Sequence, residues 1–306
     1  MDFDIWRSAN ESAIRERLAP LSRMPDGILH ERRTKFQHAV VEKVDRQIRL
    51  YFVESSRSSI WPKKSGFMSR IDLDRPLELI ALYTCALLLS LLWVPQPKRI
   101  CILGFGGGRL AMVLKHWYPE LILDCVDIDP EIIDISEEYF GVESGGDLRL
   151  ICQDAREYIE TLPSNNTYDI IFVDCFTGAG HHPGKLSTEE FYQACRSKLT
   201  PDGVIAANIL KSDPLYKRKA ATFAHVFPSL NYFKHDDTNV FIGRAQSSDA
   251  DDDIEATIAS LKEITGAKFN YRWLLSKVVS DSPDLHLFKN SDRAVLSDDL
   301  VNRICD

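Results

Sequence analysis

Residues 100–110 read ICILGFGGGRL, and this stretch decides the fold. An apolar, strand-like run leads into Gly104, and Gly106, Gly107 and Gly108 follow before a helical pattern begins. Glycine lets the backbone turn sharply and approach a ligand with no side chain in the way. The helix N-terminus then points its free N–H groups at that ligand. The stretch therefore predicts a nucleotide-type binding loop, and a tight turn that binds nothing is the alternative.

The sequence after this loop alternates between strand-like and helical segments. Near-continuous apolar runs are typical of parallel strands that helices cover on both faces. Alternation of strand and helix implies βαβ units, so we predict an α/β fold with a Rossmann-like, doubly wound, mostly parallel sheet. An antiparallel pair at 230–233 and 239–244 is expected to close the sheet. The strand-like runs are 99–104, 122–127, 148–152, 169–174 and 203–208, and the helical ones are 110–117, 131–140, 155–162 and 188–199.

Three segments are expected along the chain: an N-terminal helix and β-hairpin subdomain at 1–75, the Rossmann-like nucleoside-binding domain at 76–250, and a helical appendage at 251–306. In the first segment, Asp45-Arg46 separates two β-like runs, FQHAVVEKV and QIRLYFV, which predicts the hairpin. A basic loop with Lys63 and Lys64 is expected to follow.

Residues 79–94 are nearly all apolar and require a test for membrane insertion. The segment has 16 residues, whereas a helix needs roughly 20 to span a bilayer. Pro95 and Pro97 end it, and a strand-like run follows at once. We therefore predict a helix buried against the sheet, and no membrane partner.

Composition narrows the possible functions. The 306 residues are 44% hydrophobic and 27% charged, which is ordinary for a globular protein. The net charge of -8 argues against nucleic acid as a partner and weakly favours a cationic substrate such as a polyamine. The seven cysteines form no CxxC pair, so reduced thiols are expected rather than disulfides or zinc ligands. The charged N-terminus lacks the apolar core of a signal peptide, which predicts a cytoplasmic protein.

Three acidic residues end successive strand-like runs. Asp127 lies 23 positions past Gly104, where an acid can accept hydrogen bonds from both ribose hydroxyls. Asp154 would face the exocyclic amine of adenine, or would only cap the next helix. Asp174 stands at the carboxyl edge where doubly wound folds place their chemistry, with a strand-end cap as the alternative. The glycine-rich loop after it suggests a lid, and its His181 and His182 are expected to be solvated rather than metal-binding.

Taken together, these motifs resemble the spermidine synthase family of polyamine aminopropyltransferases, which has the class I S-adenosylmethionine-dependent methyltransferase fold. The resemblance covers residues 30–245. It is carried by GFGGG, VDID, DAREY, LSTEEFY and LTPDGVIAAN, with TKFQHAVVE and SRIDLDRPLEL nearer the N-terminus and SDRAVLSDDL near the C-terminus.

The resemblance implies a role for each matching residue. Asp174 would be the catalytic carboxylate near the attacking amine, and Tyr83 its neighbour. The glycine loop would cradle the sulfonium side chain, and Asp127 would hold the ribose. The implied cofactor-binding residues are Gln37, Gly104, Gly106, Gly107, Gly108, Asp127, Ile128, Asp154 and Ala155.

The sequence departs from the family pattern at several places. The family loop usually reads GGGDG, and its acid grips the primary amine of decarboxylated S-adenosylmethionine; Gly107 stands there. The family's Asp-x-x-Asp-Pro has Thr177 in place of the second acid and lacks the proline. The later Tyr-Pro-Ser-Gly segment has no counterpart. Arg109 would attract a carboxylate, which favours intact S-adenosylmethionine, unless it lies on the solvent face of its helix.

The main hypothesis is therefore a transferase that moves an aminopropyl group from a sulfonium nucleoside to a small amine. The alternatives are an S-adenosylmethionine-dependent methyltransferase and a non-catalytic nucleoside-binding relative. The expected cofactor is S-adenosylmethionine or its decarboxylated form, with methylthioadenosine as product and no metal. A homodimer is expected. The departures predict weak or absent spermidine synthesis from putrescine.

Overall fold

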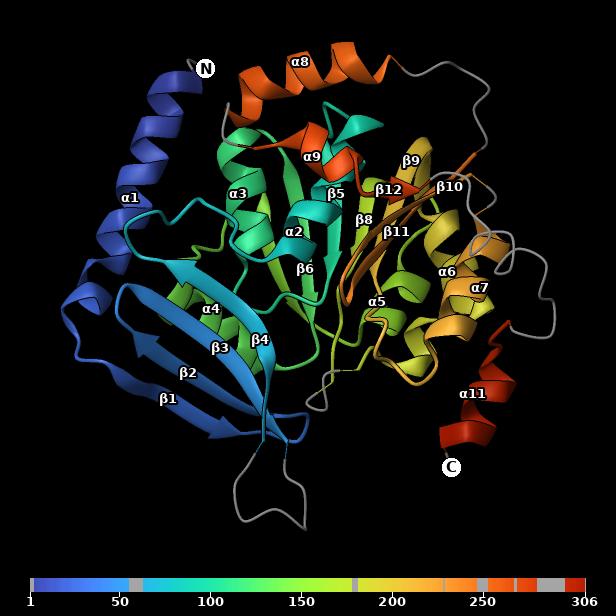
Figure 1. Ribbon diagram of the computed structural model, residues 1–306, viewed down its shortest axis with the longest axis horizontal. Coiled ribbons are helices and arrows are strands. Elements are labelled where there is room, and N and C mark those ends of the chain that lie inside the picture. Colours follow the sequence, from blue (N-terminus) through green and yellow to red (C-terminus); the bar gives the residue numbers. More distant parts are fainter. Residues whose placement is uncertain are drawn as a thin grey trace. The chain divides into compact units, whose positions relative to one another are not determined.

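The computed structural model describes residues 3–54, 63–177, 181–227, 229–246, 253–266, 269–279 and 295–305. Two compact units make up the chain, and each collects segments that are distant in sequence (Figure 1). The first unit is Met1–Thr84, Ile102–Asp154 and Phe176–His181, and the second is Cys85–Cys101, Ala155–Cys175 and His182–Asp306. The sequence predicts boundaries at 75/76 and 250/251, which divide the chain into three consecutive stretches. These boundaries stay a prediction.

The first unit begins with a helix and an antiparallel sheet. The sheet has the order β1-β2-β3-β4, and Asp45 turns the predicted hairpin with a φ of 53°. Lys63 and Lys64, expected in a loop, instead open a strand that pairs with the end of β3. That expectation was wrong because the hydrogen bonds of this strand come from a neighbour that local sequence does not reveal. The elements are α1 (Phe3–Arg23), β1 (Gly27–Arg33), β2 (His38–Val44), β3 (Gln47–Glu54) and β4 (Lys63–Asp72).

Alternating strands and helices complete the first unit. β6 and β7 pair in parallel, and the core side chains Leu123, Cys125 and Val126 are buried. Asp129 caps α4, Pro130 opens that helix, and Gly141 ends it in the left-handed conformation. The elements are β5 (Arg99–Leu103), whose last two residues belong to this unit, α3 (Arg109–Trp117), β6 (Ile122–Asp127), α4 (Pro130–Phe140) and β7 (Leu148–Cys152).

The second unit contains the strand order β12-β10-β11-β9-β8. β8 pairs in parallel with β9, whereas β9 with β11 and β10 with β11 are antiparallel, as the sequence predicted for the last pair. The elements are α5 (Ala155–Thr161), β8 (Tyr168–Val173), η2 (Gly184–Leu186), α6 (Glu189–Ser197), β9 (Leu199–Asn208), α7 (Tyr216–Val226), β10 (Leu230–His235), β11 (Thr238–Arg244), α8 (Ile254–Thr265), α9 (Tyr271–Leu275), β12 (Val278–Val279) and α11 (Asp298–Cys305).

The predicted fold class is confirmed: the protein is α/β, its central strands are mostly parallel, and a small antiparallel sheet precedes them. The apolar segment is shorter as a helix than predicted. It forms α2 (Leu82–Leu87) and then a 3-10 turn, η1 (Leu88–Leu92). All side chains of η1 are buried, and η1 contacts α8, α9 and β9. Among the described residues, no helix combines the length and the apolar character that crossing a membrane requires.

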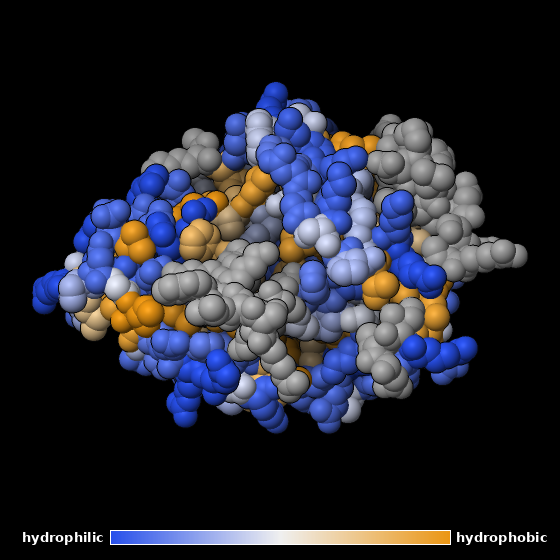
Figure 2. All heavy atoms as spheres, turned by 60° about the horizontal axis from the view of Figure 1, so that its bottom comes forward, coloured by the Kyte–Doolittle hydropathy of each residue, from blue (hydrophilic) through white to orange (hydrophobic). Residues whose placement is uncertain are grey.

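Few large apolar side chains are exposed in the part of the chain that the structure describes. On the face drawn in Figure 2, hydrophilic residues surround small separate groups of hydrophobic ones. Among the described residues, the large hydrophobic side chains with substantial exposure are Phe3, Ile5, Met24, Ile28, Phe67, Ile128 and Trp273. The apolar segment at 82–92 contributes none of them, so its hydrophobicity serves the core.

Leu91→Ala should lower the free energy of unfolding by about 2–5 kcal/mol, because it opens a cavity in the core. Leu91 is 0% exposed, whereas Ile5 is 70% exposed. The control Ile5→Ala should therefore change stability by less than about 0.5 kcal/mol. Urea unfolding of both variants measures the difference. Equal effects would contradict a core role for this segment.

Candidate active site

The glycine loop of the first unit adopts backbone conformations that suit glycine. Gly104, Gly106 and Gly108 have φ values of 88°, 52° and 63°, in the left-handed region. The N–H of Gly104 donates to the carbonyl of Val126 at 2.9 Å, and the N–H of Gly108 donates to that of Phe105 at 3.0 Å. The loop is thus a folded turn that leads directly from β5 into α3.

Asp127 joins this loop to the end of β6. Its carboxylate accepts hydrogen bonds from the main-chain N–H of Phe105 and of Asp129, both at 3.0 Å. Burial raises the pKa of Asp127, and the N–H groups that it accepts from counteract that effect. The predicted ribose-binding acid is therefore also a structural link that holds the glycine loop in place.

Asp129 is a functional candidate that the sequence prediction missed. Only 1% of it is exposed, and its carboxylate accepts from Gln37 Nε2 at 3.0 Å and from Thr34 Oγ1 at 2.7 Å. Asp129 also accepts from the N–H of Glu131, as the cap of α4. An acid directly before a helix-opening proline was a visible capping signal. The link to Gln37 was not visible, because the two residues lie far apart in sequence.

The remaining predicted nucleoside residues surround these elements. Ile128, between Asp127 and Asp129, is 38% exposed, and its carbonyl contacts the Cys152 thiol. Gln153 donates its N–H to the carbonyl of Asp127 at 3.0 Å. Asp154 follows directly, at the end of the first unit, and Ala155 opens α5 in the second. The first unit thus brings together the glycine loop, Asp127, Ile128 and, through Asp129, Gln37.

Asp174 follows β8 in the second unit. Its Oδ1 accepts a hydrogen bond from Asn208 Nδ2 at 2.9 Å. Burial raises the pKa of Asp174 to about 7, although the bond from Asn208 opposes this rise. Tyr83 belongs to the first unit, where its hydroxyl donates to the carbonyl of Met68 at 2.9 Å. The carboxylate that the sequence predicted as catalytic is therefore poised to exchange a proton near neutral pH.

Comparison with known proteins identifies the family. The pattern of the spermine/spermidine synthase domain matches residues 87–242. The chain belongs to this family. Its sequence is 32% identical over 221 residues to a polyamine aminopropyltransferase of Vibrio vulnificus, covering 71% of each chain. A polyamine aminopropyltransferase of Chromobacterium violaceum is 31% identical over 160 residues, which are 52% of this chain and 60% of that protein.

Solved structures agree with the fold of the family. A probable spermidine synthase from Corynebacterium glutamicum has a TM-score of 0.59 and 20% identity, covering 83% of this chain and 93% of that one. A spermidine synthase in complex with the transition-state analogue AdoDATO has a TM-score of 0.59 and 18% identity, covering 85% and 88%. Human methyltransferase-like protein 13 in complex with SAH has a TM-score of 0.52 and 23% identity, covering 60% and 89%. These similarities show the fold alone.

Gly107, where the spermidine synthase family usually has an acid, has no room for a side chain. A Cβ at this position would lie 2.6 Å from Ser69 Oγ and 2.7 Å from Phe140 Cδ1. Both distances are too short for a real contact, so Ser69 or the Phe140 ring would have to move. The departure at Gly107 is thus matched by neighbours that occupy the space.

Arg109 does not behave as predicted. It is 4% exposed, so the alternative that its side chain lies on the solvent face of the helix is wrong. Its guanidinium donates to the carbonyls of Pro76 and Glu78, and burial lowers its pKa to about 10. Nη2 makes these bonds to the main chain between β4 and α2, and Nη1 donates to Met112 Sδ, so this end of the guanidinium is engaged within the protein rather than by a ligand carboxylate. The sequence could not reveal that residues 76–78 cover this helix.

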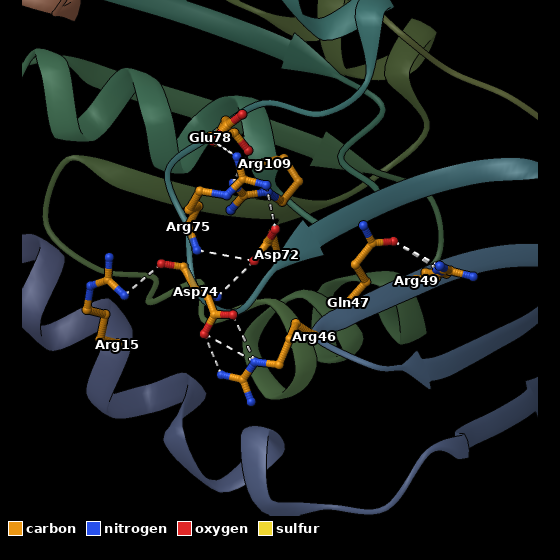
Figure 3. A network of polar contacts seen from close by, with 9 residues as sticks. All are labelled: Arg15, Arg46, Gln47, Arg49, Asp72, Asp74, Arg75, Glu78 and Arg109. Atoms are coloured by element: carbon orange, nitrogen blue, oxygen red, sulfur yellow. Dashed lines mark hydrogen bonds and ion pairs between the residues drawn. The ribbon is translucent and has the colours of Figure 1, made fainter. Parts of the chain in front are cut away.

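The segment that Arg109 supports is also held by ion pairs (Figure 3). Arg75 pairs with Asp72 at 3.0 Å and with Glu78 at 2.8 Å, and Arg46 pairs with Asp74 at 2.7 Å. Asp72 and Asp74 thus already have arginine partners, which argues against either carboxylate replacing the acid that is missing at Gly107.

His182 is buried, at 2% exposed, so the expectation of a solvated side chain was wrong for this residue. Its Nδ1 lies 3.0 Å from Ser187 Oγ. Burial and the nearby Lys219 lower the pKa of His182 to about 3. Lys219 itself pairs with Asp213 at 2.6 Å and donates to the carbonyl of His182. This cluster anchors the chain after the predicted lid, whose residues 178–180 lie outside the described residues.

Two further predictions concern the loop after Asp174. One is Thr177, which stands in place of the family's second acid, and the other is metal binding. Thr177 is exposed and donates its N–H to the carbonyl of His181 at 2.8 Å. Among the described residues, no group of three or more histidine, cysteine or acidic side chains has a geometry suited to a metal ion.

Gly107→Ala should lower the free energy of unfolding by about 1–3 kcal/mol, because the added Cβ overpacks the space that Ser69 and Phe140 fill. Urea unfolding measures the loss. Ser69→Gly removes one of the two close atoms, so the double variant should recover part of the loss relative to Ser69→Gly alone. A Gly107→Ala variant as stable as the wild type would show that this space is not filled.

Proposed function

We propose that this chain transfers an aminopropyl group from a sulfonium nucleoside to a primary amine. The observation that carries the proposal is Asp174, a partly buried carboxylate with a pKa of about 7 at the end of a buried parallel strand. A free amine has a pKa near 10, so it is mostly protonated at neutral pH and cannot attack. A carboxylate of raised pKa beside it can accept that proton.

The residues of the first unit fit the nucleoside. A Cβ at Gly106 would lie 3.8 Å from the carbonyl oxygen of Met68, an ordinary van der Waals contact, so this part of the loop is less crowded than Gly107. Asp127 would hold the ribose, Asp154 and Ala155 the adenine, and Ile128 would offer an apolar surface. Gln37 would contact the nucleoside with its amide held by Asp129. When bound, the sulfonium nucleoside supplies a carbon that is activated toward an amine.

The residues of this chain would then position the amine and accept its proton. Asp174 takes one proton from the ammonium group, and the lone pair of the nitrogen attacks the carbon next to sulfur. The carbon–sulfur bond breaks, and its electron pair leaves with a neutral thioether. Tyr83 is proposed as a neighbour of the reacting groups. The protein contributes position and proton acceptance, which account for much of the rate in a displacement of this kind.

The relatives of this chain support aminopropyl transfer rather than methyl transfer, and the departure at Gly107 makes the form of the cofactor the point to test. The family's acid for the cofactor amine is missing there, and Ser69 and Phe140 occupy its space. Purified protein should be offered S-adenosylmethionine or its decarboxylated form with a panel of amines. Release of methylthioadenosine supports aminopropyl transfer, and release of S-adenosylhomocysteine supports methyl transfer. Efficient turnover with putrescine would overturn the prediction of weak spermidine synthesis.

A cytoplasmic homodimer completes the proposal. Of the described cysteines, Cys101, Cys125 and Cys195 are buried and form no disulfide, which suits a reducing compartment. Sedimentation measurements at several protein concentrations test the dimer.

Asp127→Asn should weaken the binding of methylthioadenosine by about 1–3 kcal/mol. The NH₂ group of asparagine replaces one carboxylate oxygen, and it cannot accept a hydrogen bond from a ribose hydroxyl. Calorimetric titration measures the affinity. Asp134→Asn, an exposed position on the neighbouring helix α4, should bind as the wild type does. Unchanged affinity in Asp127→Asn, with a normal melting temperature, would contradict the proposed ribose site.

The rate of transfer should rise with pH and level off above about 7, because Asp174 must be ionised to accept a proton. Asp174→Asn should lose activity by about 10²- to 10⁴-fold.

The same raised pKa has a consequence for stability. The folded state holds this proton more tightly than the unfolded chain, so the stability that Asp174 contributes is present below about pH 4 and is lost as pH rises through about 7. Between pH 5 and 8, the melting temperature of Asp174→Asn should therefore fall less than that of the wild type. Identical pH profiles of melting temperature in both proteins would contradict the raised pKa.

A further inference from the structure

Asn208 has a buried oxygen that no described residue satisfies. It ends β9 in the second unit and is 2% exposed. Its Nδ2 donates to Asp174 Oδ1 at 2.9 Å, but its Oδ1 has no hydrogen-bond partner among the described residues. Leaving a buried acceptor unsatisfied disfavours the folded state. Such an atom next to a proposed catalytic carboxylate calls for a functional explanation.

The orientation of this amide follows from its neighbour. An ionised carboxylate can only accept hydrogen bonds, so the NH₂ end of Asn208 must face Asp174. Turning the amide by 180° would set two oxygens against each other. The register of the sheet keeps the two residues together, because β8 and β9 are parallel and Val173 pairs with Ala207, one residue before each. The unsatisfied oxygen is thus a direct result of the contact with Asp174.

We propose that Asn208 is an amine-binding residue, whose Oδ1 accepts a hydrogen bond from an N–H of the acceptor amine while Asp174 takes its proton. This inference rests on the proposed function and adds a second contact to its acceptor site. A primary ammonium has three N–H groups. One proton passes to Asp174, and the two that remain on the neutral amine need acceptors while its lone pair attacks carbon. Asn208 Oδ1 is an acceptor for one of them.

Two substitutions separate this role from support of Asp174. Asn208→Leu removes both the donor and the acceptor at nearly constant size. Asn208→Asp keeps an acceptor but, like leucine, cannot donate an amide N–H to Asp174. If Oδ1 binds the amine, the two variants should differ, because only aspartate still offers an oxygen to a cationic amine. If Asn208 only positions Asp174, the variants should behave alike.

Calorimetric titration of protein saturated with methylthioadenosine should be carried out with putrescine, 1,3-diaminopropane and spermidine. For an amine that binds the wild type, Asn208→Leu should weaken binding by about 5- to 150-fold. Asn208→Asp should bind within about threefold of the wild type, since the acceptor remains. Both variants should bind methylthioadenosine normally, which serves as the control for folding together with melting temperature. Wild-type amine affinity in Asn208→Leu, or equal losses in both variants, would overturn the proposal.

Turnover with the decarboxylated nucleoside separates this inference from the proposed function. A wild type that binds an amine but releases no methylthioadenosine refutes aminopropyl transfer, and the binding comparison still judges Asn208. A wild type that turns over, with an unchanged KM for the amine in Asn208→Leu, refutes only the role of Asn208. If none of the three amines binds, the acceptor class is wrong and the inference fails with it.

Discussion

The carboxylate of Asp127 is the interaction on which the first unit's site depends. It accepts from the main chain of the glycine loop on one side and from that of Asp129 on the other. A carboxylate at the end of a buried strand needs such donors, since burial alone disfavours its charged form. The loop in turn needs a fixed acceptor, because its left-handed glycines have little preference of their own. Asp129 extends this connection to Gln37 and the start of β2.

Burial and hydrogen-bond donors also set the properties of the carboxylate of Asp174, at the end of β8 in the second unit, but its donors differ. Asp174 has one donor from a side chain, Asn208, and no main-chain N–H supports it among the described contacts. Burial raises the pKa of both carboxylates, and at Asp174, where one side-chain donor opposes it, the pKa reaches about 7. Asp127 is supported as a fixed acceptor, whereas Asp174 is suited to gain and lose a proton. Two aspartates at strand ends thus have different chemistry because different donors surround them.

Where the glycine loop departs from the family pattern, neighbouring groups of the protein fill the space or make hydrogen bonds. Ser69 and Phe140 fill the space beside Gly107, and the Arg109 guanidinium is directed at main-chain carbonyls. A buried arginine in this arrangement stabilises the segment between β4 and α2, where a row of ion pairs also lies. Local electrostatics read from sequence neighbours therefore gave a misleading picture of the cofactor site.

Hydrophobic periodicity and glycine placement determined the fold class and the strands of the central sheet, and the resemblance of the motifs indicated the family. Those features act through neighbouring residues, and burial on both faces of parallel strands leaves an unmistakable apolar pattern. The positions of Asp127 and Asp174 followed in the same way, because strand ends are visible in sequence. Only the tertiary structure decided that Lys63 and Lys64 begin a strand, that His182 and Arg109 are buried, and that Asn208 pairs with Asp174. Arg109, His182 and Asn208 depend on partners that are distant in the chain, and hydrogen bonds and burial across such distances leave no local pattern in the sequence.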